Sequence, residues 1–167
     1  IKIKSKNLLY MNKPTVLISK REDYLDFEIL SDMFQENNRM KCKFFSAVSS
    51  PHVYFEKNKK LLATGIISQN KKITPYNLRE ELYNTVKECS SFKPSYLIYI
   101  IRLFNAKSIL DPSSGWGDRL IAAMAENVRY VGVDPNKDLH PVYQEMIDFF
   151  AKSDTKKFTM IEDTIQD

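Results

Sequence analysis

The sequence predicts an α/β fold in which a small parallel sheet follows an irregular, basic α+β region. Between residues 107 and 161, short apolar segments alternate with segments of helical periodicity. This order of strand, helix, strand, helix and strand is typical of a parallel sheet with helical crossovers. The chain has 167 residues, of which 43% are hydrophobic, so it is able to bury a core.

Residues 1–72 form the first predicted region. Apolar side chains near helical spacing predict a short amphipathic helix over residues 23–34, namely Leu25, Ile29, Met33 and Phe34. Residues 42–55 are a mixed aromatic and β-branched stretch with a Ser-Ser-Pro interruption. Residues 57–60 are predicted to form a basic turn that leads into residues 61–68.

Residues 73–167 form the second predicted region, which begins with two helices. Thr74 and Pro75 supply an N-cap and a first-turn proline, and apolar residues then recur every four positions at Leu78, Leu82 and Val86. A second helix starts at Pro94 and stops at Asn105. Because this helix is apolar on most sides, we expect it to be largely buried.

Three strands and two helices complete the second region. The strands are predicted at residues 107–111, 130–134 and 158–161. The helices are predicted at residues 118–126 and 139–152.

Charge is divided unevenly along the chain. Residues 1–107 contain 19 Lys and Arg against 10 Asp and Glu, whereas residues 108–167 contain 6 against 11. A basic half joined to an acidic half indicates that the first half meets a polyanion such as nucleic acid. Solvated lysines without a partner explain the same counts, so charge alone leaves both interpretations open.

Several classes of protein are disfavoured. Cys42 and Cys89 are separated by 46 residues without a Cys-x-x-Cys pattern, and His52 and His140 lie far from both, so neither a disulfide framework nor a metal centre is expected. The apolar run at residues 96–104 is too short to span a bilayer, and the basic start lacks the features of a secretory signal. We therefore expect an intracellular protein, in the cytoplasm or nucleus, without a membrane segment.

The most informative motif is Asp-Pro-Ser-Ser-Gly-Trp-Gly at residues 111–117, between the first predicted strand of the sheet and a helix. Ligands of open α/β sheets bind at this edge, and the two glycines allow close approach to the backbone. Asp134 ends the next strand, where a carboxylate is able to accept hydrogen bonds from both hydroxyls of a ribose. Together these features indicate a ligand that contains adenosine.

Two common adenosine ligands are disfavoured. A dinucleotide fingerprint requires a third glycine or alanine where this chain has Leu120, and no Gly-Lys-Ser/Thr of a P-loop occurs. A nucleoside with an uncharged linker, such as S-adenosylmethionine, remains.

These motifs resemble motifs I and II of class I S-adenosylmethionine-dependent methyltransferases. The Asp-Pro opening is similar to that of DNA methyltransferases that modify amino groups, and the string SILDPSSGWGDRLIAAMA, preceded by Phe-Lys-Pro, resembles DNA-methylase-like proteins of phages and large viruses. Ser113 stands where most members with small-molecule substrates have glycine, which favours the nucleic-acid branch. The resemblance implies a Rossmann-like sheet, of which residues 73–167 would be the N-terminal half, with about three strands.

The resemblance also assigns residues to the binding of S-adenosylmethionine. The methionine end of the cofactor would be cradled by Phe92, Lys93 and Pro94. The loop beneath the sulfonium and amino group would consist of Asp111, Pro112, Ser113, Gly115 and Gly117. The ribose would be held by Asp134 with Pro135 beside it, and the adenine amino group would face Asp163, with Glu162 and Asp167 as near alternatives.

Several residues also have structural interpretations. Asp111 is a candidate cap for the following helix, and Arg119 is able to pair with Asp111 or with a substrate phosphate. Trp116 is interpreted as a packing residue over the loop, and Asp118 as a first-turn acid. Structural or surface roles are favoured for both histidines.

Catalytic residues are not identified. In the related enzymes a segment with adjacent prolines, after the fourth strand, binds the target amino group, and none of the seven prolines here is adjacent to another. A full fold of this type has about seven strands, and a bare sheet edge is rarely tolerated. We therefore expect the missing strands to come from the rest of a longer protein, the favoured alternative, or from a second chain.

The expected function is transfer of a methyl group to an exocyclic amino group of adenine or cytosine in DNA, which needs no metal. One alternative is the same cofactor with a protein or small-molecule substrate. Another is a non-catalytic subunit that binds the cofactor or nucleic acid. The candidates for contacting DNA are the basic residues Arg39, Lys41, Lys43, Lys57, Lys59 and Lys60.

Overall fold

The computed structural model describes residues 8–10, 13–15, 30–151 and 154–165. The chain divides into two compact units, one made of Ile1–Phe34 with Ser91–Asp167 and the other of Gln35–Ser90. Among the described residues, no helix is both long and apolar enough to cross a membrane.

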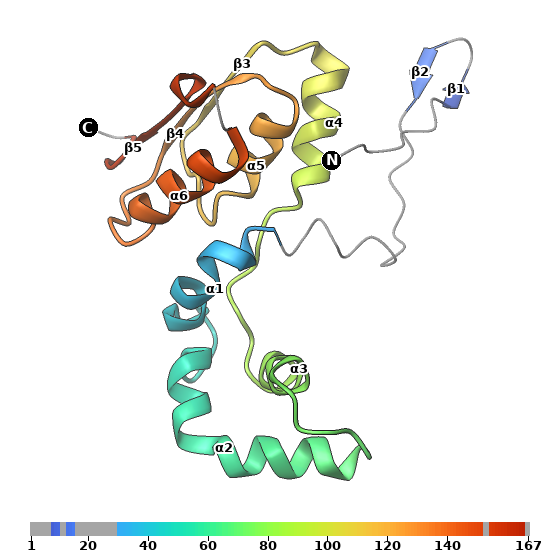
Figure 1. The fold of residues 1–167 in the computed structure, drawn as a ribbon, viewed down its shortest axis with the longest axis vertical. Helices are drawn as coiled ribbons and strands as arrows, with labels where there is room; N and C mark the ends of the chain where they lie inside the picture. Colours follow the sequence, from blue (N-terminus) through green and yellow to red (C-terminus); the bar gives the residue numbers. More distant parts are fainter. Residues whose placement is uncertain (1–7, 11–12, 16–29, 152–153, 166–167) are drawn as a thin grey trace. The chain divides into compact units, whose positions relative to one another are not determined.

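The first unit contains a parallel sheet of three strands that alternate with helices along the chain (Figure 1). Its elements are α4 (Pro94–Phe104), β3 (Ser108–Asp111), α5 (Asp118–Ala125), β4 (Arg129–Val133), α6 (His140–Ala151), a 3-10 turn (Thr155–Lys157) and β5 (Phe158–Ile161). Two short strands, β1 (Leu8–Tyr10) and β2 (Lys13–Thr15), pair in an antiparallel manner. The predicted α/β class is confirmed, and the predicted ends of the elements from α4 to β5 agree to within one residue.

The strand order β3-β4-β5 places both crossover helices on the same face of the sheet. Right-handed crossovers that advance in one direction across a sheet put their helices on one side, and Figure 1 shows α5 and α6 together in front of the strands. In register across the sheet, Ile109 pairs with Tyr130, and Tyr130 pairs with Phe158. Tyr130 and Phe158 belong to the core that these helices cover, and the partly buried Ile109 packs against it.

The opposite face of the sheet is less covered. Leu110 and Ile161 are 66% and 41% exposed. A shallow groove of about 220 Å³ on this side is lined by Ser108, Ile109, Leu110, Arg129 and Val131. Since parallel sheets are normally covered on both faces, this face leaves apolar surface open within the described part of the first unit.

Helix α4 ends as predicted but is less buried than predicted. Asn105 adopts a left-handed backbone conformation (φ 48°) immediately after the helix. Leu97, Ile98 and Ile101 are buried, whereas Phe104 is 73% exposed. The prediction of a largely buried helix is therefore wrong, because among the described elements α4 packs mainly against α5 and much of its remaining surface is exposed.

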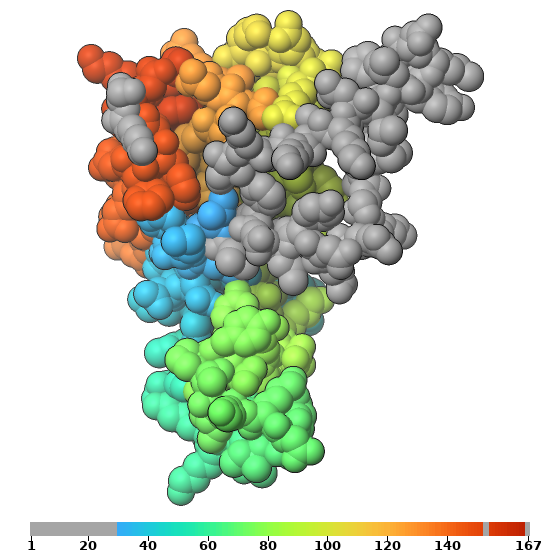
Figure 2. Space-filling view, turned by 45° about the vertical axis from the view of Figure 1, so that its right-hand side comes forward, coloured from blue at the N-terminus to red at the C-terminus, as the bar shows by residue number. Residues whose placement is uncertain are grey.

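The second unit consists of helices. They are α1 (Asp32–Lys41), which begins just before the unit boundary, α2 (Pro51–Ser68) and α3 (Pro75–Thr85). Leu62 of α2 packs with Leu82 and Val86 in a small core, and the end of α2 and α3 form a continuous green surface in Figure 2. The boundary expected between residues 72 and 73 thus falls inside this unit, between two helices that pack together.

Helix α1 differs from the helix predicted at residues 23–34, of which residues 23–29 lie outside the described part of the chain. The observed helix continues to Lys41, and its buried side chains are the polar residues Gln35 and Arg39. Met33, which the apolar spacing had suggested for the buried face, is 67% exposed. Polar side chains fill the buried positions, so hydrophobic periodicity did not mark this helix.

The prediction of a basic turn at residues 57–60 is wrong, because these residues lie within helix α2. The Ser50 hydroxyl caps the helix by accepting from the backbone N–H of Val53 at 3.4 Å, and Pro51 occupies the first turn. The helix then continues through the lysines, with non-helical backbone angles at Asn58 (φ −126°, ψ 22°). The lysines and this local kink concealed the helical period in the sequence.

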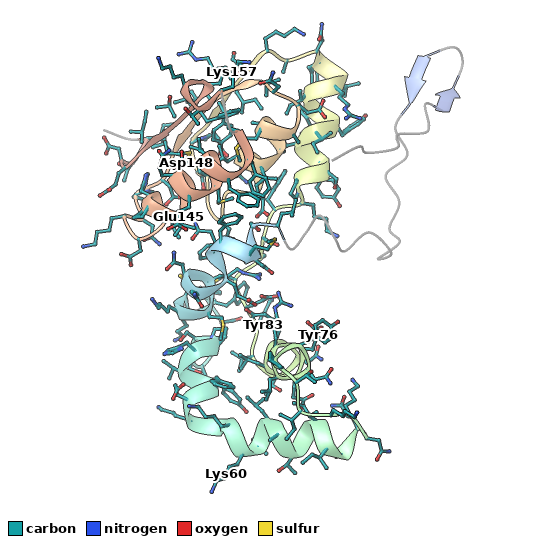
Figure 3. The ribbon with its side chains drawn as sticks, viewed as in Figure 1. Lys60, Tyr76, Tyr83, Glu145, Asp148 and Lys157 are labelled. Carbon is teal, nitrogen blue, oxygen red and sulfur yellow. The ribbon has the colours of Figure 1, made fainter. Side chains whose placement is uncertain are left out.

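Helix α3 begins as predicted and is joined to α1 by charged side chains. Thr74 Oγ1 accepts from the backbone N–H of Asn77 at 3.1 Å. Arg79 Nε lies 2.5 Å from Glu36 Oε1, and the hydroxyl of Tyr83, labelled in Figure 3, donates to the same oxygen at 3.0 Å. Burial raises the pKa of Tyr83, so this hydroxyl remains protonated and a donor.

Candidate cofactor-binding site

The carboxyl ends of the three strands meet at one edge of the sheet, where residues 111–117 form a bend. Two backbone hydrogen bonds extend the strand pairing past the strand ends: Ser114 N–H to Val133 O and Asp134 N–H to Ile161 O, each at 3.0 Å. The bend after β3 is thereby attached to β4, and the residue after β4 to β5. This is the edge at which open α/β sheets bind ligands.

Asp134 is directed toward the bend. Its Oδ2 accepts from the backbone N–H of Gly115 at 2.8 Å, and its Oδ1 accepts from the backbone N–H of Asn136 at 3.0 Å. The residue is only 7% exposed. Because its two oxygens have four lone pairs between them, the carboxylate retains capacity for another donor, such as a sugar hydroxyl.

Asp111 is the central acceptor of the bend. Its carboxylate accepts from Ser113 N–H at 3.2 Å, from Arg119 Nε at 2.6 Å and from the Tyr130 hydroxyl at 2.5 Å. The helix α5 has Gly117 at its N-cap and no side-chain capping hydrogen bond, so Asp111 does not cap it. Asp111 holds the shape of the bend. Of the two partners expected for Arg119, Asp111 and a substrate phosphate, the structure shows Asp111.

The glycines of the bend have different surroundings. Both Gly115 (φ 58°) and Gly117 (φ 85°) have left-handed backbone conformations. Among the described residues, a Cβ at Gly115 would meet Ser113 O alone, at 3.9 Å, whereas a Cβ at Gly117 would lie 2.8 Å from Met146 Cε. Gly115 therefore leaves room for close approach of a ligand, and Gly117 lets α6 pack against the bend.

Ser114 fits tightly beneath the bend. It is buried, and the Tyr130 hydroxyl lies 3.3 Å from its Oγ. A Cβ on Gly132 of β4 would overlap the Ser114 hydroxyl. The small residue at position 132 is thus required by packing between the strand and the bend.

Two residues of α6 contact backbone carbonyls of the site, and neither was predicted as a site residue. The hydroxyl of Tyr143 donates to the backbone carbonyl of Gly115, and His140 Nε2 lies 2.8 Å from the carbonyl oxygen of Asp134. Burial, followed by the charge of Asp134, raises the pKa of Tyr143, so its hydroxyl remains a donor. Tyr143 has the helical spacing of a core residue, which is why the sequence did not distinguish it.

Phe92 is joined to the start of α5. Its backbone N–H donates to Asp118 Oδ2 at 3.2 Å, and the Arg119 guanidinium lies 5.0 Å from the centre of its ring. Pro94 is buried in the first turn of α4, while Lys93 is exposed. The predicted Phe92 segment and the bend thus both contact Arg119 of α5.

The remaining predicted residues are exposed and take less part in these contacts. Pro112, Ser113 and Pro135 have exposed side chains. Asp163 follows β5 at the same edge, where its Oδ1 accepts from the backbone N–H of Thr164 at 2.8 Å. Glu162 is also exposed, and Asp167 lies outside the described residues.

Trp116 is half-buried and packs against the core, in agreement with its interpretation as a packing residue. In the described part of the chain, no three His, Cys, Asp or Glu side chains gather in a way that could hold a metal ion.

The basic residues that were candidates for DNA contact are not equivalent. Arg39 has a side chain only 4% exposed, paired with Glu88 at 2.7 Å, so it is not placed to reach a phosphate. Lys59 pairs with Glu56 at 2.8 Å. Four exposed lysines of the second unit remain as candidates: Lys41, Lys43, Lys57 and Lys60.

No protein-family model, no curated protein and no solved structure matches the chain.

Proposed function

We propose that this chain is the cofactor-binding part of an S-adenosylmethionine-dependent methyltransferase that acts on an exocyclic amino group of adenine or cytosine in DNA. The observation that carries the proposal is the hydrogen bond from Gly115 N–H to Asp134 Oδ2 at 2.8 Å. It places a carboxylate with spare acceptor capacity directly beside the backbone that leaves room for a ligand. A ribose with two adjacent hydroxyls is the group that such a carboxylate recognises.

The residues present fit a sulfonium nucleoside better than a nucleotide. Lysine and arginine side chains are absent from residues 112–118 of the bend, and Arg119 is engaged by Asp111. A pyrophosphate or triphosphate would require such cations or a glycine-rich phosphate loop. The acidic edge formed by Asp134 instead suits a neutral sugar attached to a positively charged sulfur.

The residues of this chain would position the cofactor rather than act as acids or bases. S-adenosylmethionine, when bound, supplies a methyl group on sulfur that a nitrogen nucleophile displaces in line. Asp134 would hold the ribose, and Asp111 would keep the bend in shape through Arg119 and Tyr130. Asp118 would fix Phe92 next to the bend, where the methionine end of the cofactor is expected.

The choice of DNA as substrate rests on the Asp-Pro opening of the bend, on Ser113, and on exposed lysines of the second unit. Residues 35–90 contain 10 Lys and Arg against 5 Asp and Glu. Exposed lysines provide the salt-dependent part of DNA affinity, which is independent of sequence. The base and the target sequence would be selected elsewhere.

The cofactor assignment is tested by measuring the affinities of two ligands for the wild type and for one variant. Calorimetry would compare S-adenosylhomocysteine with its 2′-deoxy analogue, on the wild type and on Asp134→Asn. We expect the wild type to prefer the ribose ligand by roughly 10- to 100-fold, since a hydrogen bond to a charged group contributes about 1.5–3 kcal/mol. Asp134→Asn should lose most of that preference.

The matched control is Glu145→Gln, which neutralises an exposed carboxylate of α6 labelled in Figure 3. It should retain the preference of the wild type for the ribose ligand. If Asp134→Asn also retained it, the ribose assignment would be wrong. If the wild type bound neither ligand, the cofactor proposal itself would be overturned.

A further inference from the structure

The two cysteines, separated by 46 residues in the sequence, both lie outside helices in the second unit. Cys42 follows the last residue of α1, and its backbone N–H donates to Arg39 O at 3.1 Å. Cys89 lies in the irregular segment after α3. Neither position is constrained by a helical backbone, so both can adjust to a cross-link.

Two contacts made by residues near the cysteines bring their segments together. Arg39 Nη1 lies 2.7 Å from Glu88 Oε2, and Lys87 Nζ lies 4.2 Å from the centre of the Phe44 ring. Cys42 lies between the two contact residues of the first segment, and Cys89 is next to Glu88 in the second. The ion pair is largely enclosed, because the Arg39 side chain is only 4% exposed.

The electrostatic surroundings of Cys89 agree with this arrangement. Burial raises the pKa of its thiol, and the next largest cause of the increase is Cys42. The influence of one thiol on the ionisation of another decreases with the distance between them. Both residues are half-buried thiols and are not joined in a disulfide.

We propose that Cys42 and Cys89 form an oxidative modification site that a low-molecular-weight disulfide, such as oxidised glutathione, converts into an intramolecular disulfide. This inference is independent of the proposed methyltransferase function. A disulfide requires Cα atoms about 4.4–6.8 Å apart, and the two contacts already formed hold the segments that carry the cysteines next to each other.

The exchange proceeds in two balanced steps. The thiolate of one cysteine attacks a sulfur of oxidised glutathione, forms a mixed disulfide and releases one glutathione thiolate. The thiolate of the second cysteine then attacks the protein sulfur of that mixed disulfide and releases the second glutathione. The two protein thiols lose two protons and two electrons, and the disulfide of the oxidant is reduced to two thiols.

The product would connect the end of α1 to the segment after α3. The chain between the two cysteines contains α2 and α3, so the cross-link would close the whole helical unit. Oxidation would therefore restrict the opening of this unit, and reduction would restore it.

The test is to incubate the reduced chain with oxidised glutathione, trap remaining thiols with iodoacetamide and measure intact and peptide masses. We expect a monomer that has lost two hydrogens, carries no iodoacetamide and yields a cross-linked peptide pair containing Cys42 and Cys89. Cys42→Ser and Cys89→Ser should each stop at the mixed disulfide and retain one glutathione.

Stable accumulation of the mixed disulfide on the wild type, or disulfide-linked dimers, would overturn the proposal. A second measurement on the wild type avoids dependence on the folding of the variants. In urea, where the two segments separate, the same treatment should yield mainly mixed disulfides. Equal yields of the intramolecular disulfide in urea and in buffer would show that the fold does not bring the thiols together.

Discussion

The hydroxyl of Ser31 donates a 2.6 Å hydrogen bond to Asp118 Oδ1 and joins two segments that are 87 positions apart in the sequence. The other oxygen of the same carboxylate accepts from the backbone N–H of Phe92 at 3.2 Å. Ser31 and Asp118 are almost fully buried. One side chain at the start of α5 thus holds the segment before α1 and the segment before α4.

Asp118→Ala should lower the free energy of unfolding by about 2–4 kcal/mol, because two hydrogen bonds to a buried carboxylate are removed and their donors are left without this acceptor. Ser31→Ala should cost about 1 kcal/mol, since the bond to Phe92 remains. Urea unfolding followed by circular dichroism measures both. Asp148→Asn, an exposed carboxylate on α6, is the control and should change stability by less than about 0.5 kcal/mol. Equal effects of Asp118→Ala and Asp148→Asn would contradict this role.

Gly115→Ala and Gly117→Ala should separate cofactor binding from stability. Both place a side chain at positive φ, which costs about 1–2 kcal/mol. Gly117→Ala adds a clash with Met146 Cε at 2.8 Å, so its loss of stability should be larger by about 1–3 kcal/mol. Gly115→Ala should remain the more stable variant and yet bind S-adenosylhomocysteine about tenfold more weakly, equivalent to about 1.4 kcal/mol.

Thermal unfolding and calorimetry on the two glycine variants provide the comparison. The reverse order of stabilities would contradict the assignment of Gly117 to packing. Undiminished affinity of Gly115→Ala would mean that the cofactor does not approach that side of the bend.

The double variant Lys57→Glu with Lys60→Glu should weaken binding to duplex DNA and reduce its salt dependence. For every phosphate that the protein no longer neutralises, the slope of log K against log salt should become shallower by about 0.9. Fluorescence anisotropy over a salt series measures affinity and slope together. Lys137→Glu with Lys156→Glu changes the same amount of charge at exposed lysines of the first unit and should have a smaller effect. If both pairs behaved alike, only the net charge would matter.

The reactivity of Cys89 should depend on pH differently in the folded and unfolded chain. Burial raises the pKa of this thiol, Cys42 and Glu88 add to the increase, and Arg39 opposes it. Folding therefore favours the protonated thiol, and the stability it contributes falls as the pH rises past the pKa of the unfolded chain. Alkylation of Cys89, resolved by peptide mass analysis, should accelerate at higher pH in buffer than in urea. Coincident pH profiles would show that the fold does not perturb the thiol.

The elements of the sheet unit could be predicted because their signals are local. Pro94 marks the start of a helix, Asn105 marks its end, and the alternation of apolar strands and amphipathic helices repeats along the chain. The second unit was harder to predict, because Gln35 and Arg39 occupy buried positions of α1 where apolar residues are expected. In α2 the run of lysines and the kink at Asn58 interrupted the helical pattern.

Only part of the site could be predicted, because only some of its residues belong to local sequence motifs. Asp134 and Gly115 belong to short motifs whose spacing can be read from the sequence, and they contact each other. Tyr143 reaches Gly115 from 28 positions away, and Tyr130 reaches Asp111 from 19 positions away. When a tyrosine has the spacing of a core residue, the surrounding sequence does not show which polar atom its hydroxyl will contact.

The three hydrogen bonds of Asp111 limit what could be transplanted from this protein. Its partners Ser113, Arg119 and Tyr130 come from the bend, from α5 and from β4. Residues 111–117 grafted alone onto a foreign sheet would leave behind the guanidinium and the phenol that neutralise and orient the carboxylate. Residues 108–134 are the smallest segment that contains all three partners of Asp111, so an engineer who wants the loop must take the strand next to it as well.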